Sequence, residues 1–310
     1  MIVRNNIHIY DICWLNHAEG GMIGIFYEPE TKEELAEVCC SLYKDGKSFD
    51  IIGHTSNIYF LPSYNVDIMV STRKVKKIEY TDDRIIADCG VSVNVLARKM
   101  IKEGVKGFEG LTDLPGTVAA AVYGNASCYR CSVNDMLISI ELLKDNGEIV
   151  TLKSEELKLT KRSSALKRGE IKGVILSVML HKEYGDAEEL KKLAELNHSK
   201  RVNTQPGPKD NLGSIYAIKG GYTRKSWWPR MLANVVCLPL ILIRKDKKII
   251  KKTKIDTILK LYNSEELQPY VYGWNRFIWK DKKSHELFWK YHKIHQKLFK
   301  KSVFEIEIKG

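Results

Sequence analysis

A run of small residues in the middle of the chain, residues 111–143, constrains the fold more than any other feature. A turn containing Pro115 and Gly116 leads into three alanines at 119–121, and Gly124 follows. Small side chains let a backbone approach a flat or phosphorylated ligand, because no branched Cβ keeps the ligand away. Pro115 fixes its φ and Gly116 frees the next turn, so the loop can aim its N–H groups at a ligand. The alternative is a helix-packing face, since alanine-rich runs also occur where helices meet, and the pattern alone leaves both open.

The same stretch has the spacing of a longer motif. It matches L-x-G-I-P-G-T-V-G-G-A-V-x-M-N-A-G-A-Y at Leu111, at residues 114–118, at Ala121, Val122, Asn125 and Ala126, and at Tyr129. This motif resembles that of the UDP-N-acetylenolpyruvoylglucosamine reductases, flavoenzymes with the vanillyl-alcohol-oxidase or PCMH-type FAD-binding fold. Ala119 and Ala120 replace Gly-Gly, and Ser127 and Cys128 replace Gly-Ala. The resemblance implies an α+β protein, with an FAD-binding domain of two α+β subdomains and a smaller C-terminal substrate domain.

A second turn, residues 53–57, reads Gly-His-Thr-Ser-Asn. In the family the sequence G-G-G-S-N at this place holds the flavin pyrophosphate; here His54 and Thr55 depart from it, although Thr55 still offers a hydroxyl. The wider fold includes relatives in which a loop histidine is bonded covalently to the flavin. We favour a non-covalent turn histidine at His54, because the register puts the linking position nearer Ser56. The cofactor-binding residues implied by the resemblance are Gly53, His54, Thr55, Ser56, Asn57, Leu114, Pro115, Gly116, Thr117, Gly124, Asn125, Ala126 and Val174.

Three further motifs imply the catalytic residues. Residues 161–167 resemble Y-R-x-S-x-F, which places Arg162 near flavin and substrate, where a guanidinium can stabilise an enolate-like charge. The residues around Gln205 and Pro206, followed by Gly-Ser at 213–214, resemble Q-P-x(n)-G-S-x-F, so Ser214 falls on the serine that protonates the substrate carbon. Residues 303–308 resemble L-E-x-E-V, and Glu307 falls on the catalytic carboxylate. The structural alternatives are a solvated basic loop, a common turn pair and a half-buried edge strand. The implied substrate-binding residues are Tyr129, Arg201 and Tyr216.

Basic residues and tryptophans are concentrated in the C-terminal part of the chain. The 310 residues carry a net charge of +12, but residues 221–302 contain 20 Lys and Arg against 6 Asp and Glu, together with five of the six Trp residues. We therefore predict an FAD-binding domain over residues 1–185 and a basic, Trp-rich substrate or cap domain over 186–310. Seven cysteines, with no secretory signal pattern at the start of the chain, predict reduced thiols and a cytoplasmic location.

Local patterns predict the elements of the first part. Strands are expected at 1–15, 22–27, 49–53, 66–70, 75–80 and 84–88, and a helix capped by Thr31 is expected to run to about Tyr43. A second helix is expected over 95–104. The sequence Asp-Asn-Gly at 145–147 predicts a hairpin between strands 138–144 and 148–152.

The C-terminal stretch is where the resemblance fails. Residues 227–260 combine two Trp, an apolar stretch to Ile243 and a polybasic run, which suits peripheral contact with an anionic membrane. The alternative is a buried helix or strand with a solvated basic face. Residues 274–301 predict an amphipathic aromatic helix. Cys128 and Cys131 lack a second ligand pair, so we expect no metal site, and the absence of a recognised motif argues against nucleic acid as partner.

The function implied by the resemblance is an FAD-dependent oxidoreductase that reduces a nucleotide-sugar enolpyruvyl ether, with NADPH as electron donor, in peptidoglycan synthesis. Ala217, Ile218 and Lys219 stand where the family has K-N-P, on the substrate side. One alternative is therefore a flavin enzyme acting on another sugar, including a lipid-linked one in surface-glycan synthesis. Another is a non-catalytic flavin-binding module at a membrane surface.

Overall fold

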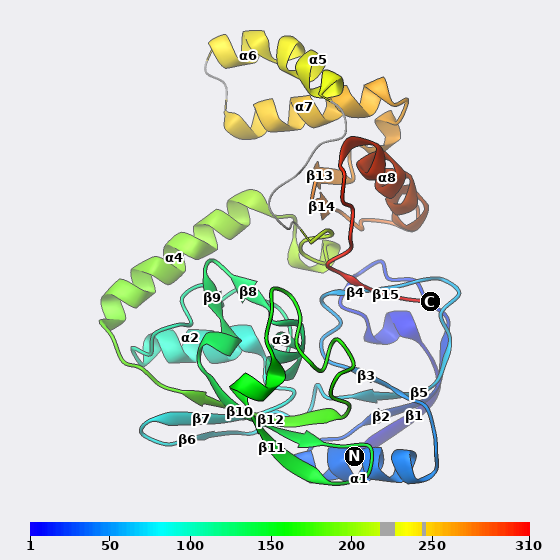
Figure 1. Cartoon of the computed structure of the whole chain (residues 1–310). Helices are drawn as coiled ribbons and strands as arrows, with labels where there is room; N and C mark the ends of the chain where they lie inside the picture. The colour runs from blue at the N-terminus through cyan, green and yellow to red at the C-terminus, as the bar shows by residue number, and fades with distance from the viewer. Residues whose placement is uncertain (218–226, 244–245) are drawn as a thin grey trace. The chain divides into compact units, whose positions relative to one another are not determined.

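The chain divides into two compact units in the computed structural model, which describes residues 1–217, 227–243 and 246–310 (Figure 1). The first unit comprises Met1–Ile12, Gly21–Thr55 and Ser63–Thr204; the second comprises Cys13–Gly20, Ser56–Pro62 and Gln205–Gly310. Ile218, Lys219 and the polybasic residues Arg244 and Lys245 lie outside the described residues.

The first unit extends beyond the predicted boundary at 185 and includes the helix α4 (Ala187–Thr204). Side chains of α4 bond to the preceding part of the chain. Asn197 donates from Nδ2 to the carbonyl of Glu109 at 3.1 Å, and His198 Nδ1 lies 2.8 Å from a carboxylate oxygen of Asp113. These contacts place α4 with the first unit rather than with the C-terminal part.

One sheet of the first unit has four strands in the order β1-β2-β5-β3. Its strands are β1 (Ile2–His8), β2 (Met22–Glu28), β5 (Val66–Ser71) and β3 (Asp50–Ile52), with β2, β5 and β3 parallel and β1 antiparallel to β2. The helix α1 (Lys32–Lys44) begins where predicted, because the Thr31 hydroxyl accepts the N–H of Glu34 at 3.2 Å. The predicted apolar face of α1 is buried.

The other sheet has five antiparallel strands in the order β11-β10-β12-β7-β6. They are β11 (Ile149–Lys153), β10 (Leu137–Leu143), β12 (Val174–His181), β7 (Arg84–Asp88) and β6 (Ile78–Tyr80). The predicted hairpin is confirmed: β10 and β11 pair across the turn at 145–147, where Lys144 donates its N–H to the carbonyl of Glu148 at 2.9 Å. The helices α2 (Val93–Lys102) and α3 (Val118–Gly124) contribute apolar residues to the same core.

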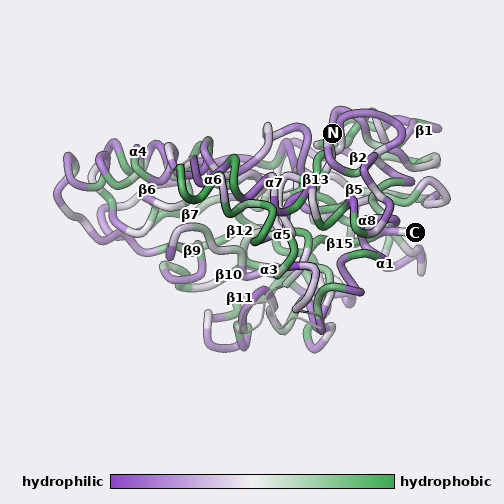
Figure 2. Tube along the Cα trace, turned by 90° about the horizontal axis from the view of Figure 1, so that it is seen from above, coloured by the Kyte–Doolittle hydropathy of each residue, from purple (hydrophilic) through white to green (hydrophobic). Residues whose placement is uncertain are grey.

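The second unit is built around an aromatic core. Its strands are β4 (Ile58–Phe60), parallel to β15 (Glu307–Lys309), and β13 (Val271–Gly273), antiparallel to β14 (Arg276–Phe277). Its helices are α5 (Trp228–Val236), α6 (Leu238–Leu242), α7 (Lys247–Leu261) and α8 (Ser284–Leu298). Coloured by hydropathy, α5 and α6 are largely green (Figure 2). Every helix among the described residues is too short or too polar to cross a bilayer.

The prediction of a helix over 274–301 is wrong for its first residues. Residues 271–277 form the β13–β14 hairpin, and α8 begins only at Ser284. The Asp281 carboxylate accepts the Ser284 N–H at 3.1 Å, which satisfies a donor that the first turn of a helix leaves unpaired. The remaining short elements are β8 (Ser127–Cys128), β9 (Cys131–Ser132) and the 3₁₀ turns Ile9–Ile12, Val133–Asp135, Ser154–Leu157, Pro208–Asp210 and Glu265–Leu267.

Candidate functional site

The two glycine-bearing turns singled out from the sequence touch each other within the first unit. A Cβ built on Gly53 would lie 2.8 Å from the Thr117 Oγ1 atom, closer than real Cβ atoms come to a neighbour. Gly116 has φ of +126°, in a region that side chains rarely enter, and Thr55 is buried with φ of +53°. The Thr117 side chain thus packs directly against the backbone of Gly53, so the two turns lie next to each other and only glycine fits at position 53.

Arg73 holds the first of these turns in place. Its Nε donates to the carbonyl of Gly53 at 2.9 Å, and its Nη2 donates to the carbonyl of Ile12. The sequence analysis missed Arg73, because a basic residue that follows a strand has no distinguishing pattern. Its role here is to position the turn.

The alanine run belongs to the helix α3, and burial of its side chains supports the helix-packing interpretation for part of it. Thr117 caps the helix by accepting the N–H of Ala120 at 3.3 Å. Ala119 and Ala121 are buried in the core of the first unit, whereas Ala120 is exposed. Helix packing therefore explains two of the alanines, and close approach of the preceding turn to a ligand stays a prediction.

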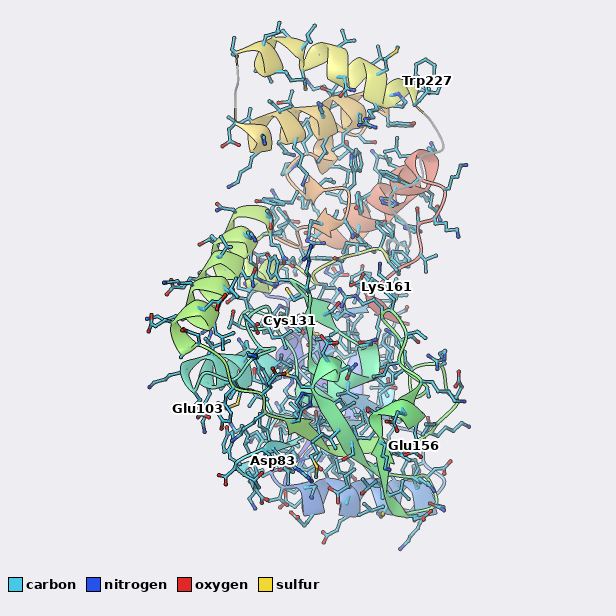
Figure 3. The ribbon with its side chains drawn as sticks, turned by 60° about the vertical axis from the view of Figure 1, so that its left-hand side comes forward. Asp83, Glu103, Cys131, Glu156, Lys161 and Trp227 are labelled. Atoms are coloured by element: carbon cyan, nitrogen blue, oxygen red, sulfur yellow. The ribbon has the colours of Figure 1, made fainter. Side chains whose placement is uncertain are left out.

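The C-terminal end of α3 is bonded to the loop that carries Arg162. Asn125 has φ of +44° and donates from Nδ2 to the carbonyl of Thr160 at 2.7 Å. Ser164 donates from Oγ to the carbonyl of Tyr123 at 2.7 Å. Two backbone bonds between Thr160 and Ser163 close a tight turn whose tip is Lys161, labelled in Figure 3, and Arg162. The structure thus couples a predicted cofactor residue, Asn125, to the predicted catalytic arginine.

Three predicted residues gather at the hairpin β8–β9, marked by Cys131 in Figure 3. Burial raises the pKa of the Cys128 thiol, and the neighbouring guanidiniums of Arg201, which bonds to it, and Arg162 act in the opposite direction. Burial also raises the pKa of Tyr129, against the opposing influence of Arg201. Arg162 and Arg201 therefore both lie close to Cys128, and Arg201 also lies close to Tyr129, with the carboxylate of Asp113 in the same neighbourhood.

The second unit collects the other predicted catalytic residues. Glu305 donates its N–H to the carbonyl of Ile215 at 2.8 Å, so the segment containing Ser214 pairs with the segment leading to Glu307. Glu307 in turn donates its N–H to the carbonyl of Asn57 at 2.9 Å. Ser214, Glu307 and Asn57 therefore lie on three adjacent chain segments.

Two residues of the β13–β14 hairpin form hydrogen bonds to the segment that contains Ser214. Arg276 donates from Nη1 to Ser214 Oγ at 2.7 Å. The Asn275 side chain accepts the N–H of Tyr216 at 2.6 Å and donates to its carbonyl at 3.1 Å. Sequence reasoning missed both residues because they lie where the family motifs are absent, and only the fold brings them to Ser214.

Two other predicted residues are part of the core. Val174 is 4% exposed at the start of β12, and Tyr216 is 1% exposed. The Tyr216 ring stacks on His295 with 3.7 Å between ring centroids, and its hydroxyl lies 3.0 Å from His292 Nδ1. A cofactor contact for Val174 and a substrate contact for Tyr216 stay predictions from the resemblance.

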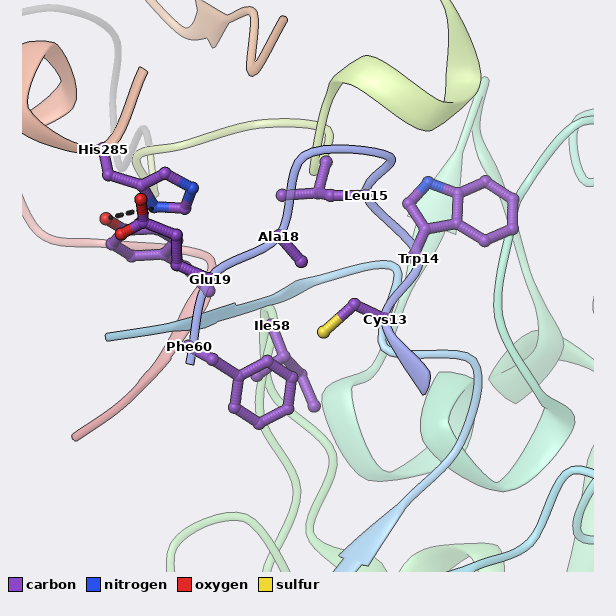
Figure 4. Close-up of a pocket in the computed structure, with 9 residues that line it drawn as sticks. Cys13, Trp14, Leu15, Ala18, Glu19, Ile58, Phe60 and His285 are labelled. Carbon is purple, nitrogen blue, oxygen red and sulfur yellow. Dashed lines mark hydrogen bonds and ion pairs between the residues drawn. The ribbon is translucent and has the colours of Figure 1, made fainter. Parts of the chain in front are cut away.

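A small cavity lies inside the second unit (Figure 4); none of the predicted site residues lines it, although its lining residue Ile58 pairs with Glu307 between β4 and β15. His285 dominates its polar side: Nδ1 lies 3.1 Å from the Tyr59 hydroxyl, Nε2 lies 2.9 Å from the carbonyl of His17, and Glu19 approaches to 3.7 Å. The remaining lining residues are Cys13, Trp14, Leu15, Ala18, Ile58 and Phe60. Because every polar group named here has a partner, this cavity is a structural feature of the core. Among the described residues, no cluster of three or more His, Cys, Asp or Glu side chains could hold a metal ion.

Comparison with known proteins identifies the cofactor. Residues 24–153 match the family model described as "FAD binding domain". This part of the chain is an FAD-binding domain, and the sequence is similar to UDP-N-acetylenolpyruvoylglucosamine reductases. It is 32% identical over 199 residues to the UDP-N-acetylenolpyruvoylglucosamine reductase of Carboxydothermus hydrogenoformans, covering 64% of this chain and 65% of that protein. The corresponding reductase of Alkaliphilus oremlandii is 28% identical over 226 residues, which cover 71% of this chain and 73% of the relative.

A solved structure supports the same fold over the whole chain. The MurB of Thermus caldophilus aligns with 100% of both chains at a TM-score of 0.65 and 18% sequence identity. The PCMH-type α+β fold and FAD as cofactor are therefore confirmed, and the relatives support an FAD-dependent oxidoreductase of the MurB type. Since the aligned part spans about two thirds of the Carboxydothermus relative, at 65%, the reaction itself is argued below.

Proposed function

We propose that this protein is an FAD-dependent reductase that uses NADPH to reduce the enolpyruvyl ether of a nucleotide sugar, as the names of its relatives imply for them. The observation that supports it best is the Arg276–Ser214 bond of 2.7 Å, on a segment paired with the strand leading to Glu307. A hydroxyl that accepts a charged donor is a stronger acid than a free one, because the donor stabilises the alkoxide left behind. A serine has no other evident need for such an arrangement.

The residues present suit FAD. The Thr117 side chain packs against Gly53, so these two turns are adjacent, and Thr55, Gly116 and Asn125 all have positive φ, a backbone conformation found in anion-binding turns. We propose that the pyrophosphate is held by the turn at 53–57 and by residues 114–117, and that the isoalloxazine lies near residues 124–126. His54 is half-buried, and we propose a non-covalent role for it.

Bound FAD supplies hydride transfer from NADPH to an electron-poor double bond. The chain's own residues do the rest. Ser214 gives its Oγ proton to the substrate carbon that is not attacked by hydride, while Arg276 stabilises the developing oxyanion. Arg162 offers paired N–H donors to a substrate anion, and Arg201 adds positive charge beside Tyr129. Glu307 contributes a carboxylate to the substrate side, which we propose orients the enolpyruvyl group.

A Ser214→Ala variant tests the proton donor. Under anaerobic conditions, NADPH should still bleach the flavin of this variant at the normal rate. Reoxidation by UDP-N-acetylenolpyruvoylglucosamine should slow by ~100-fold or more, the usual contribution of a positioned acid. Ser63→Ala, at an exposed serine, is the matched control and should behave as wild type. Full turnover by Ser214→Ala would remove the assignment.

A second candidate function is favoured by two observations. Ala217 stands where the resembling family has the first residue of K-N-P, and α5 and α6 expose a series of large apolar side chains. We propose, as this alternative, that the enzyme is membrane-peripheral and acts on another, lipid-linked sugar. Anaerobic reoxidation of the reduced flavin by nucleotide sugars and by lipid-linked sugars separates the two, since only the true acceptor restores the yellow colour within turnover time. A non-catalytic flavin module would not be bleached by NADPH.

A further inference from the structure

The helix α5 is amphipathic in the reverse of the usual sense, and α6 consists of apolar residues none of which is buried. A helix on a protein surface normally buries its large apolar residues and exposes polar ones. Here the residues that face inward from α5 and the turn after it are small: Pro229, Ala233 and Cys237 are buried, and the Cys237 thiol lies 3.8 Å from the carbonyl of Ile250 on α7. The large apolar residues face outward instead.

The outward-facing residues form a surface that we call the apolar ridge. It holds ten of the twenty-five large apolar side chains that are exposed in the described part of the chain. Leu242 is 72% exposed and Ile243 is 64% exposed. The other members of the apolar ridge are Trp227, Trp228, Met231, Leu232, Val235, Val236, Leu238 and Ile241. Such a concentration is far from the scattered apolar exposure of an ordinary surface and marks a docking site.

The basic residues and the tryptophan near the apolar ridge indicate the chemistry of its docking partner. Residues 227–261 contain nine Lys or Arg and only two Asp, so the apolar ridge lies within a strongly cationic segment. Lys247 and Lys251 are exposed on α7, which packs against α5. Trp227, 71% exposed, projects from the start of α5 (Figure 3), and tryptophan is the residue that prefers the boundary between lipid headgroups and acyl chains.

From these observations we infer that the apolar ridge inserts into the headgroup region of an anionic lipid bilayer, with α5 and α6 in the plane of the membrane. The helices have 9 and 5 residues, too few to span a bilayer but enough to lie on one. The exposed lysines of α7 then contact anionic headgroups. A second copy of the chain would bring two cationic segments together, so a bilayer is the better match. The inference rests on the peripheral location proposed above and is independent of the reaction.

Vesicle flotation tests the insertion. The flavin-loaded protein should float with vesicles of phosphatidylcholine and phosphatidylglycerol at a 7:3 ratio and bind pure phosphatidylcholine about tenfold or more weakly. The double variant Leu242→Glu and Ile243→Glu should lose binding to both. The matched control, Leu193→Glu and Leu196→Glu on α4, changes two other exposed leucines and should bind as wild type.

Charge reversal on α7 tests whether the docking partner is an anionic membrane. Lys247→Glu with Lys251→Glu should weaken binding to anionic vesicles by about tenfold or more, because each basic residue near the surface contributes to the attraction. The control, Lys282→Glu with Lys283→Glu, makes the same charge change at exposed lysines near the start of α8. An equal loss of vesicle binding in both double variants would show non-specific electrostatic attraction and would overturn the inference.

Two other outcomes would also overturn it: no flotation of the wild-type protein, or a lipid-free dimer that dissociates on introduction of the Leu242 and Ile243 glutamates. Reduction of the flavin by NADPH is measured for every variant. An unchanged rate with lost flotation supports membrane docking whatever the sugar substrate is, whereas failure of the proposed reaction would leave flotation intact.

Discussion

The Ser214 hydroxyl accepts a hydrogen bond from Arg276 Nη1 at 2.7 Å, and no sequence pattern connects these two residues. Ser214 was predicted from a short motif that includes the left-handed Gly213, whose φ is +80°. Arg276 lies in a hairpin for which no motif exists. A short sequence motif is enough to predict Ser214 as the proton donor. The residue proposed to stabilise its alkoxide, Arg276, comes close to it only in the folded chain.

Replacing Arg276 by Gln should slow protonation without affecting the flavin. Gln carries no charge, so the alkoxide of Ser214 is less stabilised, and we expect flavin reoxidation by substrate to fall by roughly 10- to 100-fold. Arg276→Lys should recover part of the rate. The measurement is stopped-flow absorbance across a pH series, where raising the pH should not restore the rate of the variant, because Ser214 donates from its protonated form. A variant with wild-type reoxidation and pH profile would show that Arg276 is only structural.

A methyl group at Gly53 should disturb the contact with Thr117. Because the added Cβ would lie 2.8 Å from Oγ1, Gly53→Ala forces the two turns apart, at a cost of about 1–3 kcal/mol in the free energy of unfolding. We expect a lower melting temperature and loss of bound flavin on gel filtration.

Gly124→Ala is the companion variant. A Cβ on Gly124 meets nothing within 4 Å, so the free energy of unfolding should be unchanged. If Gly124 faces the isoalloxazine as we propose, this variant should retain its melting temperature without ligand and bind FAD more weakly. Unchanged flavin affinity would remove Gly124 from the cofactor site.

At the scale of elements, patterns of short range were predicted well. The Thr31 cap, the apolar face of α1 and the hairpin between β10 and β11 each depend on residues close in sequence, and each is confirmed. The pairing of β4 with β15 and the start of α8 were not predictable in this way. Residues 271–277 alternate aromatic and polar groups that suit a helix or a strand, and only contacts with distant segments decide between them.

A buried histidine of the helix α8, His295, should make the stability of the second unit depend on pH. Burial, with a smaller effect of His292, lowers the pKa of His295 to about 3, whereas a histidine in the unfolded chain titrates near 6.5. Below pH 6.5 the unfolded state therefore binds a proton that the folded state does not, so stability falls as pH falls from 6.5 toward 3. The expected loss from this residue is about 2 kcal/mol between pH 6.5 and 5.

Tryptophan fluorescence measures this effect selectively, because all six tryptophans belong to the second unit. Urea unfolding midpoints should decrease from pH 7 to pH 5 in the wild-type protein, and His295→Gln should flatten that decrease. His198→Gln, at an exposed histidine of the first unit, should leave it unchanged. The same slope in wild type and His295→Gln would refute the assignment to His295.

At the scale of the whole molecule, each unit holds its own set of predicted residues. The first unit gathers Arg162, Arg201 and Tyr129 around a hairpin and brings together the two turns for which we propose a cofactor-binding role. The second unit gathers Ser214 and Glu307 on adjacent segments. The long motif at 111–129 was sufficient to predict the fold and the cofactor, because backbone geometry at special glycines and turns leaves a strong sequence signature. The apolar ridge was foreseen only as one of two alternatives, since composition cannot show which side of a helix is exposed.

This chain contains an FAD-binding domain, and we propose that it passes electrons through FAD to an unsaturated sugar ether. The most direct test is an anaerobic absorbance titration of the purified protein. We predict a yellow protein with the absorption bands of oxidised flavin, bleached by NADPH and restored by UDP-N-acetylenolpyruvoylglucosamine in a one-to-one ratio. A colourless protein that takes up no FAD when it is supplied would contradict the account.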